Sequence, residues 1–139
     1  MRRTYAQSIL RVIAATALCL SGAVSLAAAG GAARTVEIIA DKDNTFKVAG
    51  GQNGPLTLKA GEVVNFKITS LFGGEKARDG AVHSFVVRSL RDKGWSVRLK
   101  EGVQEFTLTA PPAGKYLIEC TVECGKGHDS MNMQMVVVK

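Results

Sequence analysis

A twelve-residue segment near the C-terminus combines two thiols, one imidazole and one thioether. These side chains are Cys120, Cys124, His128 and Met131. The segment follows a strand-like run at 115–119 and precedes another at 133–139, so we expect a loop anchored between two strands. Thiolate, imidazole and thioether are soft to borderline ligands, a mixture that suits copper better than calcium or magnesium. The pattern therefore predicts a copper site.

A mononuclear blue-copper site needs one Cys, two His and a weak axial Met, so the loop has one thiol too many and one imidazole too few. The chain contains one further histidine, His83, in a strand-like run with Phe85 and Val87 on the same face. That face is expected to be buried. The second thiol can bridge two metals, or the two cysteines can form a structural disulfide, since a spacing of four in a loop permits either. A mononuclear site is the other chemical alternative.

The motif Cys120-x-x-x-Cys124-x-x-x-His128-x-x-Met131, preceded by Val82-His83-Ser84-Phe85, resembles the binuclear CuA site. That site occurs in the periplasmic domain of cytochrome c oxidase subunit II and in nitrous oxide reductase. Residues 112–116 also resemble the cupredoxins generally, and the resemblance covers about residues 79–139. Gly125 is closer to the oxidase version than to the reductase version.

The resemblance implies a cofactor of two copper ions and a role for each ligand. The implied ligands are His83, Cys120, Val122, Cys124, His128 and Met131. The two thiols bridge the coppers, and each imidazole binds one of them. The thioether is a weak ligand to one copper, and the backbone carbonyl of Val122 is a weak ligand to the other. The oxidase family usually has Glu at this last position, but the ligand is the carbonyl, so Val122 does not disable the site.

Short segments with apolar alternation and regular turn signals indicate an all-β domain. The clearest alternation lies in 62–69, where Val64, Phe66 and Ile68 share one face. The strand-like segments are 35–40, 45–48, 56–58, 62–69, 82–87, 96–99, 103–109, 115–119 and 133–139. The pattern favours an antiparallel Greek-key sandwich or barrel of about seven to eight strands. The resemblance makes that fold cupredoxin-like.

The N-terminus has the features of an export signal. Met-Arg-Arg is followed by an uncharged run at 12–33, with small-residue cleavage sites at 25–27 and 27–29. We therefore expect a signal peptide at 1–29, a linker at 30–34 and the copper domain at 35–139. The uncharged run approaches the length of a spanning helix, so an uncleaved inner-membrane anchor facing the periplasm is the alternative.

The charge of the exported domain is modest. Removal of Arg2, Arg3 and Arg11 lowers the formal net charge from +6 to about +3, which is too small to indicate nucleic-acid binding. A basic stretch at 88–100 is expected to be a solvated face. The oxidase family generally receives basic cytochromes on an acidic surface, and the basic stretch departs from that pattern. Trp95, Met133 and Met135 are expected to pack in the core.

The resemblance implies an electron carrier of the periplasm rather than an enzyme. Its partners would be redox proteins, with a c-type cytochrome as donor and a terminal oxidase or reductase as acceptor. Two alternatives stay open: a small component similar to oxidase subunit II, and a copper-delivery protein. No nucleophile–base pair, phosphate loop or paired-carboxylate site is present in the sequence.

Overall fold

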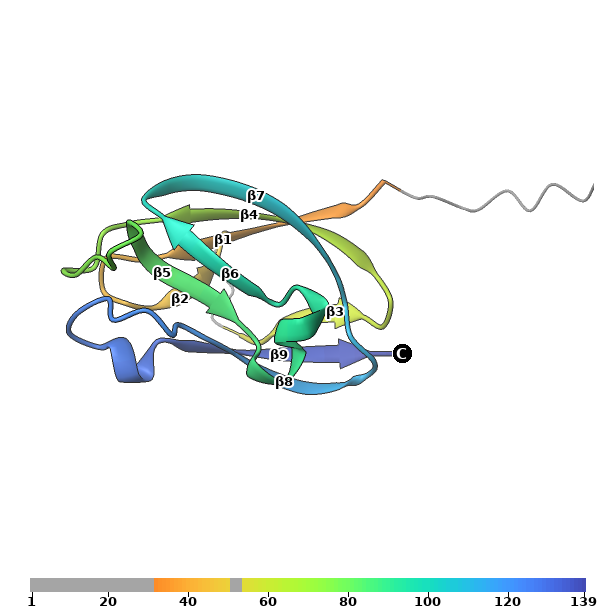
Figure 1. Ribbon diagram of the computed structural model, residues 1–139. Helices are drawn as coiled ribbons and strands as arrows, with labels where there is room; N and C mark the ends of the chain where they lie inside the picture. Colours follow the sequence, from red (N-terminus) through yellow and green to blue (C-terminus); the bar gives the residue numbers. More distant parts are fainter. Residues whose placement is uncertain (1–31, 51–53) are drawn as a thin grey trace, which may run out of the picture. The chain divides into compact units, whose positions relative to one another are not determined.

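The computed structural model describes residues 32–50 and 54–139, and these form two β-sheets (Figure 1). The expected signal peptide, 1–29, lies outside the described residues. The strands are β1 (Arg34–Ala40), β2 (Phe46–Val48), β3 (Leu56–Lys59), β4 (Val63–Ser70), β5 (Ala81–Val86), β6 (Ser96–Lys100), β7 (Gly102–Thr109), β8 (Gly114–Glu119) and β9 (Asn132–Val138). One sheet has the order β2-β1-β4-β7 and the other β3-β9-β8-β5-β6. The prediction of a β-sandwich is confirmed.

The described strands number nine, one for each strand-like segment found in the sequence and more than the estimated total of seven to eight, because the short strands β2 and β3 both pair with neighbours. Antiparallel pairing was expected throughout, but β1–β4 and β3–β9 are parallel. These pairs arise because the chain crosses between the sheets before it returns, and period-two alternation does not encode which strand becomes the neighbour. Two short 3-10 helices, η1 (Arg88–Lys93) and η2 (His128–Ser130), were also not expected.

The core between the sheets is aromatic. Phe66 on β4 contacts Phe85 on β5 and Trp95, with ring centroids 5.3 and 5.8 Å apart. All three are at most 1% exposed, and the Trp95 indole donates a hydrogen bond to the Thr109 carbonyl at 3.1 Å. Tilted and edge-on ring pairs at such separations are favourable beyond their apolar burial. The predicted core positions of Trp95, Met133 and Met135 are confirmed.

Strand β5 is buried along its whole length. It pairs with β6 at five residues, Ala81 and 83–86, and with β8 at Val86–Glu119. Its position carries Phe85 into the aromatic core and holds His83 near the β8–β9 connection. The hairpin of β8 and β9 is the other rigid element at this end, with Glu119 opposite Asn132 as the last ladder pair.

Among the described residues, no helix has the length and apolar character needed to cross a membrane.

Candidate metal centre

The cysteine-containing loop is fastened at its two ends by the β8–β9 hairpin. Beyond the last ladder pair, the Cys120 amide donates to the Met131 carbonyl at 3.0 Å. Cys120 and Met131 therefore face each other across the mouth of the hairpin. Both side chains are buried, at 5% and 2% exposure.

Two glycines shape the turn within the loop. Gly125 and Gly127 have φ values of 109° and 95°, in the left-handed region that favours glycine. A side chain at Gly125 would also clash, because its Cβ would lie 2.9 Å from the Gly73 carbonyl oxygen. His128 then opens η2, and its amide donates to the Gly125 carbonyl at 3.1 Å. The turn thus brings His128 back over the thiols.

The sulfur atoms of the loop converge. The Sγ atoms of Cys120 and Cys124 lie 3.8 Å apart and are not joined in a disulfide. Cys124 Sγ also lies 3.5 Å from His128 Nδ1 and 3.7 Å from Met131 Sδ. Cys120 Sγ lies 3.3 Å from the Val122 carbonyl oxygen. Every loop residue proposed from the sequence therefore has its donor atom beside one of the two thiols.

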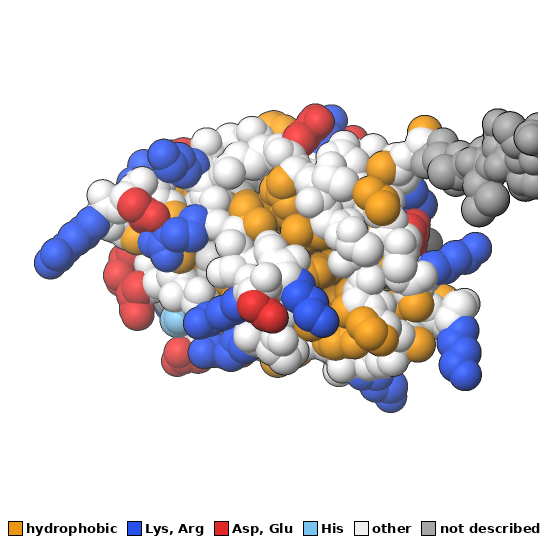
Figure 2. All heavy atoms as spheres, turned by 45° about the vertical axis from the view of Figure 1, so that its right-hand side comes forward, with side chains coloured by type: hydrophobic (Ala, Val, Ile, Leu, Met, Phe, Trp, Pro, Cys, Tyr) orange, Lys and Arg blue, Asp and Glu red, His pale blue; other side chains and the backbone are white. Residues whose placement is uncertain are grey.

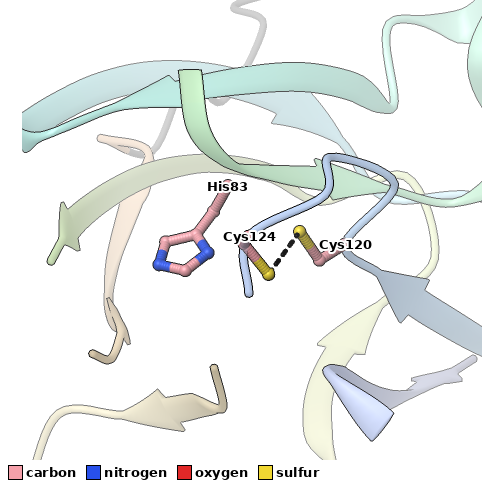
Figure 3. Close-up of side chains that lie close together, drawn as sticks. All are labelled: His83, Cys120 and Cys124. Atoms are coloured by element: carbon pink, nitrogen blue, oxygen red, sulfur yellow. Dashed lines mark hydrogen bonds between the residues drawn. The ribbon is translucent and has the colours of Figure 1, made fainter. Parts of the chain in front are cut away.

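His83 reaches the same point from β5, the neighbour of β8 in the same sheet (Figure 3). Its Nε2 lies 2.7 Å from the Leu71 carbonyl oxygen, which can only accept, so Nε2 carries the proton and Nδ1 carries the lone pair. Nδ1 is buried without a hydrogen-bond partner. One ligand atom each from His83, Cys120 and Cys124 lies within 4.8 Å of the others. The free lone pair of the imidazole is thus part of the thiol cluster.

Burial opposes charge at this cluster when no cation is present. It raises the pKa of the Cys124 thiol, and the neighbouring Cys120 raises it further. It also lowers the pKa of His83, which favours the neutral imidazole. Two adjacent buried thiolates repel each other, so their ionised form requires a compensating positive charge.

The donor set fits copper. It comprises two thiols, two imidazole nitrogens, a thioether and a carbonyl, and soft thiolate and thioether donors are those that select copper(I), while imidazole also suits copper. The unpartnered Nδ1 of buried His83 is a polar atom that a bound cation would satisfy. Hard cations prefer oxygen donors, which this cluster lacks apart from the Val122 carbonyl.

A small surface pocket of about 140 Å³ opens beside the thiols. Its lining includes Cys120, His128 and Met131, together with the ion pair of Arg88 and Glu119, whose atoms are 2.8 Å apart. His128 is half-buried, whereas Cys124 and His83 are fully buried. The cluster is therefore close to solvent on the His128 side. A larger pocket, about 480 Å³, lies between β1 and the chain around β3, and its lining contains no Cys or His.

The five basic side chains in the stretch at 88–100 are exposed, as expected for a solvated face. Two of its arginines are paired: Arg88 with Glu119, and Arg98 with Asp79. Figure 2 likewise shows Lys and Arg side chains interleaved with Asp and Glu on the face drawn. The stretch does not form a continuous field of one sign.

Three residues that support the cluster were not identified from the sequence. Ser84 Oγ accepts a hydrogen bond from the Thr121 amide at 2.7 Å and lies 3.1 Å from Thr121 Oγ1. This contact ties the residue after His83 to the residue after Cys120. Leu71 orients His83 through its carbonyl. A polar Ser in a buried strand is a signal for the first contact, but the sequence gives no signal for a backbone carbonyl in a loop.

The fold is similar to those of copper proteins of known structure. One match is a chain of a heme-copper terminal oxidase dimer, with a TM-score of 0.55 and 18% identity over 76% of this chain and 65% of that chain. The periplasmic domain of subunit II of cytochrome oxidase (CoxB) of Bradyrhizobium japonicum matches with a TM-score of 0.52 and 16% identity, covering 76% and 84%. Auracyanin B matches with a TM-score of 0.51 and 21% identity, covering 77% and 90%.

No protein-family profile matches the chain, and no curated protein matches it by sequence. The structural matches define the fold, which is cupredoxin-like. The matched folds include that of the periplasmic domain of oxidase subunit II, the domain whose copper motif the segment at 120–131 resembles. This chain spans 65% of the length of the terminal oxidase chain.

Proposed function

We propose that this protein is an electron carrier with a binuclear copper centre of the CuA type. The observation that carries the proposal is the second thiol: Cys120 and Cys124 place their sulfurs 3.8 Å apart, buried and unoxidised. A mononuclear blue-copper site takes one thiol, whereas a pair of bridged coppers needs both. The distance of the Cys124 sulfur from both His128 and Met131 supports the same arrangement.

In this proposal Cys120 and Cys124 would both hold the two coppers. His83 and His128 would each hold one copper through Nδ1, the nitrogen nearest the thiols for His128 and the unpartnered nitrogen for His83. The remaining two donors are weak ligands: the Met131 thioether and the Val122 carbonyl. Bound copper would supply one-electron redox chemistry, with a net charge between 0 and +1 against two thiolates, which a low-dielectric interior tolerates.

The protein's own contribution is to hold these donors still. Fast electron transfer requires small changes in ligand geometry, and neighbouring contacts hold His83 and the backbone beside Cys120. The Leu71 carbonyl orients His83, and Ser84 fixes the backbone after Cys120. Hydrogen bonds of this kind around ligands orient the donors and tune the metal. Burial of both thiols limits the access of water to them.

The proposed setting is the periplasm, after removal of residues 1–29. The structural likeness to the periplasmic subunit II domain supports an exported domain. A c-type cytochrome is the proposed donor, and a terminal oxidase or reductase is the proposed acceptor. Detection of residues 1–29 in the protein isolated from cells would instead favour the membrane-anchored form.

The test uses the purified protein loaded with copper. We expect two coppers per chain and, in the oxidised form, one unpaired electron whose paramagnetic resonance signal is split equally by both nuclei. One copper with single-nucleus splitting would contradict the binuclear centre and favour a blue-type site. A deletion strain separates electron transfer from copper delivery: loss of electron flow supports the carrier, whereas loss of copper insertion into another enzyme supports delivery.

A further inference from the structure

A buried amide side chain lies between the loops that carry the proposed ligands. Asn44, in the turn between β1 and β2, is 1% exposed. Its Nδ2 donates to the Lys126 carbonyl at 2.7 Å and to the Gly73 carbonyl at 3.3 Å. Both partners are carbonyls, which fixes the orientation of the amide, because only its NH₂ group can donate to them. One side chain thus joins three segments that are far apart in the sequence.

The two carbonyls that Asn44 binds lie close to the proposed ligands. Lys126 is two residues from Cys124 and two from His128. Gly73 is two residues from Leu71, whose carbonyl accepts the His83 Nε2 hydrogen. The amide therefore connects the loop that orients one imidazole with the loop that carries the other.

The backbone around the Asn44 side chain is packed closely against it. A Cβ at Gly73 would lie 1.9 Å from Asn44 Oδ1, so the side chain fills the space that Gly73 leaves. The Glu75 amide donates to the Cys124 carbonyl at 3.3 Å, which joins the same two loops directly. Asn44 itself has φ 56°, the one positive φ of a non-glycine residue in the described ranges 32–50 and 54–139.

Two features of Asn44 are unfavourable for the stability of the fold. Its Oδ1 is buried without a hydrogen-bond partner, and a left-handed backbone is unfavourable for a residue other than glycine, although Asn tolerates it better than most. Glycine at this position would relieve both penalties. The two hydrogen bonds across the loops are what the amide adds.

We propose that Asn44 is a positioning residue for the metal centre, because its amide fixes the separation of the loop at 71–75 from the loop at 124–128. The imidazoles of His83 and His128 are thereby held in place relative to the thiols. The effect on copper rests on the proposed function, whereas the effect on the loops does not. Removal of the amide leaves the ligands present but their relative placement loose.

The first experiment measures amide hydrogen exchange in the copper-free protein. Asn44→Gly removes the amide and keeps a residue suited to φ 56°, so the turn is not strained. We expect exchange at the Glu75 and His128 amides to be about tenfold faster, as loss of two hydrogen bonds allows. The control is Leu58→Ala in β3, a buried residue of the strand that pairs with the C-terminal end of β9. It should weaken the fold without a selective effect on these two amides.

The second experiment records the optical and paramagnetic resonance spectra and the reduction potential of copper-loaded variants. Asn44→Gly and the near-isosteric Asn44→Asp, whose carboxylate has no donor for the two carbonyls, should shift both spectra and potential with copper per chain unchanged. Leu58→Ala should shift neither. Unchanged spectra in both Asn44 variants, or exchange raised equally across the whole protein, would overturn the proposal. Wild-type protein that takes up no copper would instead overturn the proposed function, and the exchange measurement distinguishes the two failures.

Discussion

The aromatic core and the thiol-bearing end of the sandwich satisfy their buried groups in different ways. Around Phe66 and Phe85 the contacts are apolar, and the polar atom of Trp95 has its hydrogen bond. At the other end, buried polar atoms are left without partners. Among the described residues the three such side-chain atoms are Asn44 Oδ1, Ser70 Oγ and His83 Nδ1. His83 belongs to the thiol cluster, Asn44 contacts the loops at 71–75 and 124–128, and Ser70 directly precedes the first of these loops.

Buried polar groups without partners cost stability and are rare in folded proteins. Their concentration at one end indicates that this end is built for a ligand, while the aromatic core supplies the stability that tolerates the cost. The two regions should therefore respond differently to substitution. Substitutions in the core should change the free energy of unfolding and leave the copper centre intact, and substitutions at the thiol end should do the reverse.

The largest effect on the centre should follow from loss of one bridging thiol. Cys124→Ser removes the sulfur that lies beside Cys120, His128 and Met131, so copper per chain should fall from two to at most one and the binuclear signal should vanish. Copper analysis and paramagnetic resonance measure this. Glu123→Gln, an exposed change in the same loop, is the control and should leave both unchanged. Two coppers per chain in the Ser variant would refute the bridging role.

The largest effect on stability should come from the core. Phe66→Ala removes a fully buried ring that packs on Phe85 and Trp95, and large-to-small changes of this kind cost about 3–5 kcal/mol. Denaturant unfolding measures the loss. At temperatures where the variant is folded, its copper spectrum should equal that of the wild type. An altered spectrum would show that the two regions are coupled.

The sequence predicted the two regions unequally. Strands such as β4 were found because Val64, Phe66 and Ile68 alternate, and all three are buried. The donor atoms at 83 and 120–131 were found because their residue types and spacing are unusual, and the structure brings them together; their roles as ligands stay predictions. The hydrogen bonds of Asn44 to the Gly73 and Lys126 carbonyls, and the contact of the Leu71 carbonyl with His83, were not predicted from the sequence. These contacts join loops that are distant in sequence, and they use backbone atoms that every residue type carries.

A smaller effect on both stability and the copper centre is expected at Ser84. This residue lies on the core strand β5, but its side chain supports the cysteine-containing loop. Ser84→Ala leaves the partly buried Thr121 amide without its acceptor, at a cost of about 1 kcal/mol. It should also shift the spectrum of the centre with copper per chain unchanged. The control is Ser96→Ala, at an exposed position of β6. A stability loss with an identical spectrum would assign Ser84 to the fold alone.

Met131→Leu should have little effect on stability, since a buried Met-to-Leu change conserves volume and costs less than about 1.5 kcal/mol. The thioether is proposed as a weak ligand, so the centre should assemble with two coppers and a shifted reduction potential. Voltammetry and copper analysis test this together. Complete loss of copper would contradict a weak role for Met131.

The smallest effect is expected at a surface ion pair outside both regions. Arg98 pairs with Asp79 and holds the pKa of that carboxyl near 2, below its ordinary value of 3.8. Because the folded-state pKa is depressed, the pair contributes stability at pH values above about 4, and this contribution is lost as the pH falls toward 2. Both side chains are about half exposed, so the contribution is small and salt-sensitive.

Asp79→Asn in the copper-free protein tests this directly. The difference in free energy of unfolding between wild type and variant should be present at neutral pH, shrink between pH 4 and pH 2, and decrease with added salt. A difference that does not change over this pH range would mean that Asp79 acts through its hydrogen bond from the Ala81 amide, which Asn can also accept in part, rather than through its charge. In that event Asp79 supports the start of β5, two residues before His83, through this hydrogen bond and not through its ion pair with Arg98.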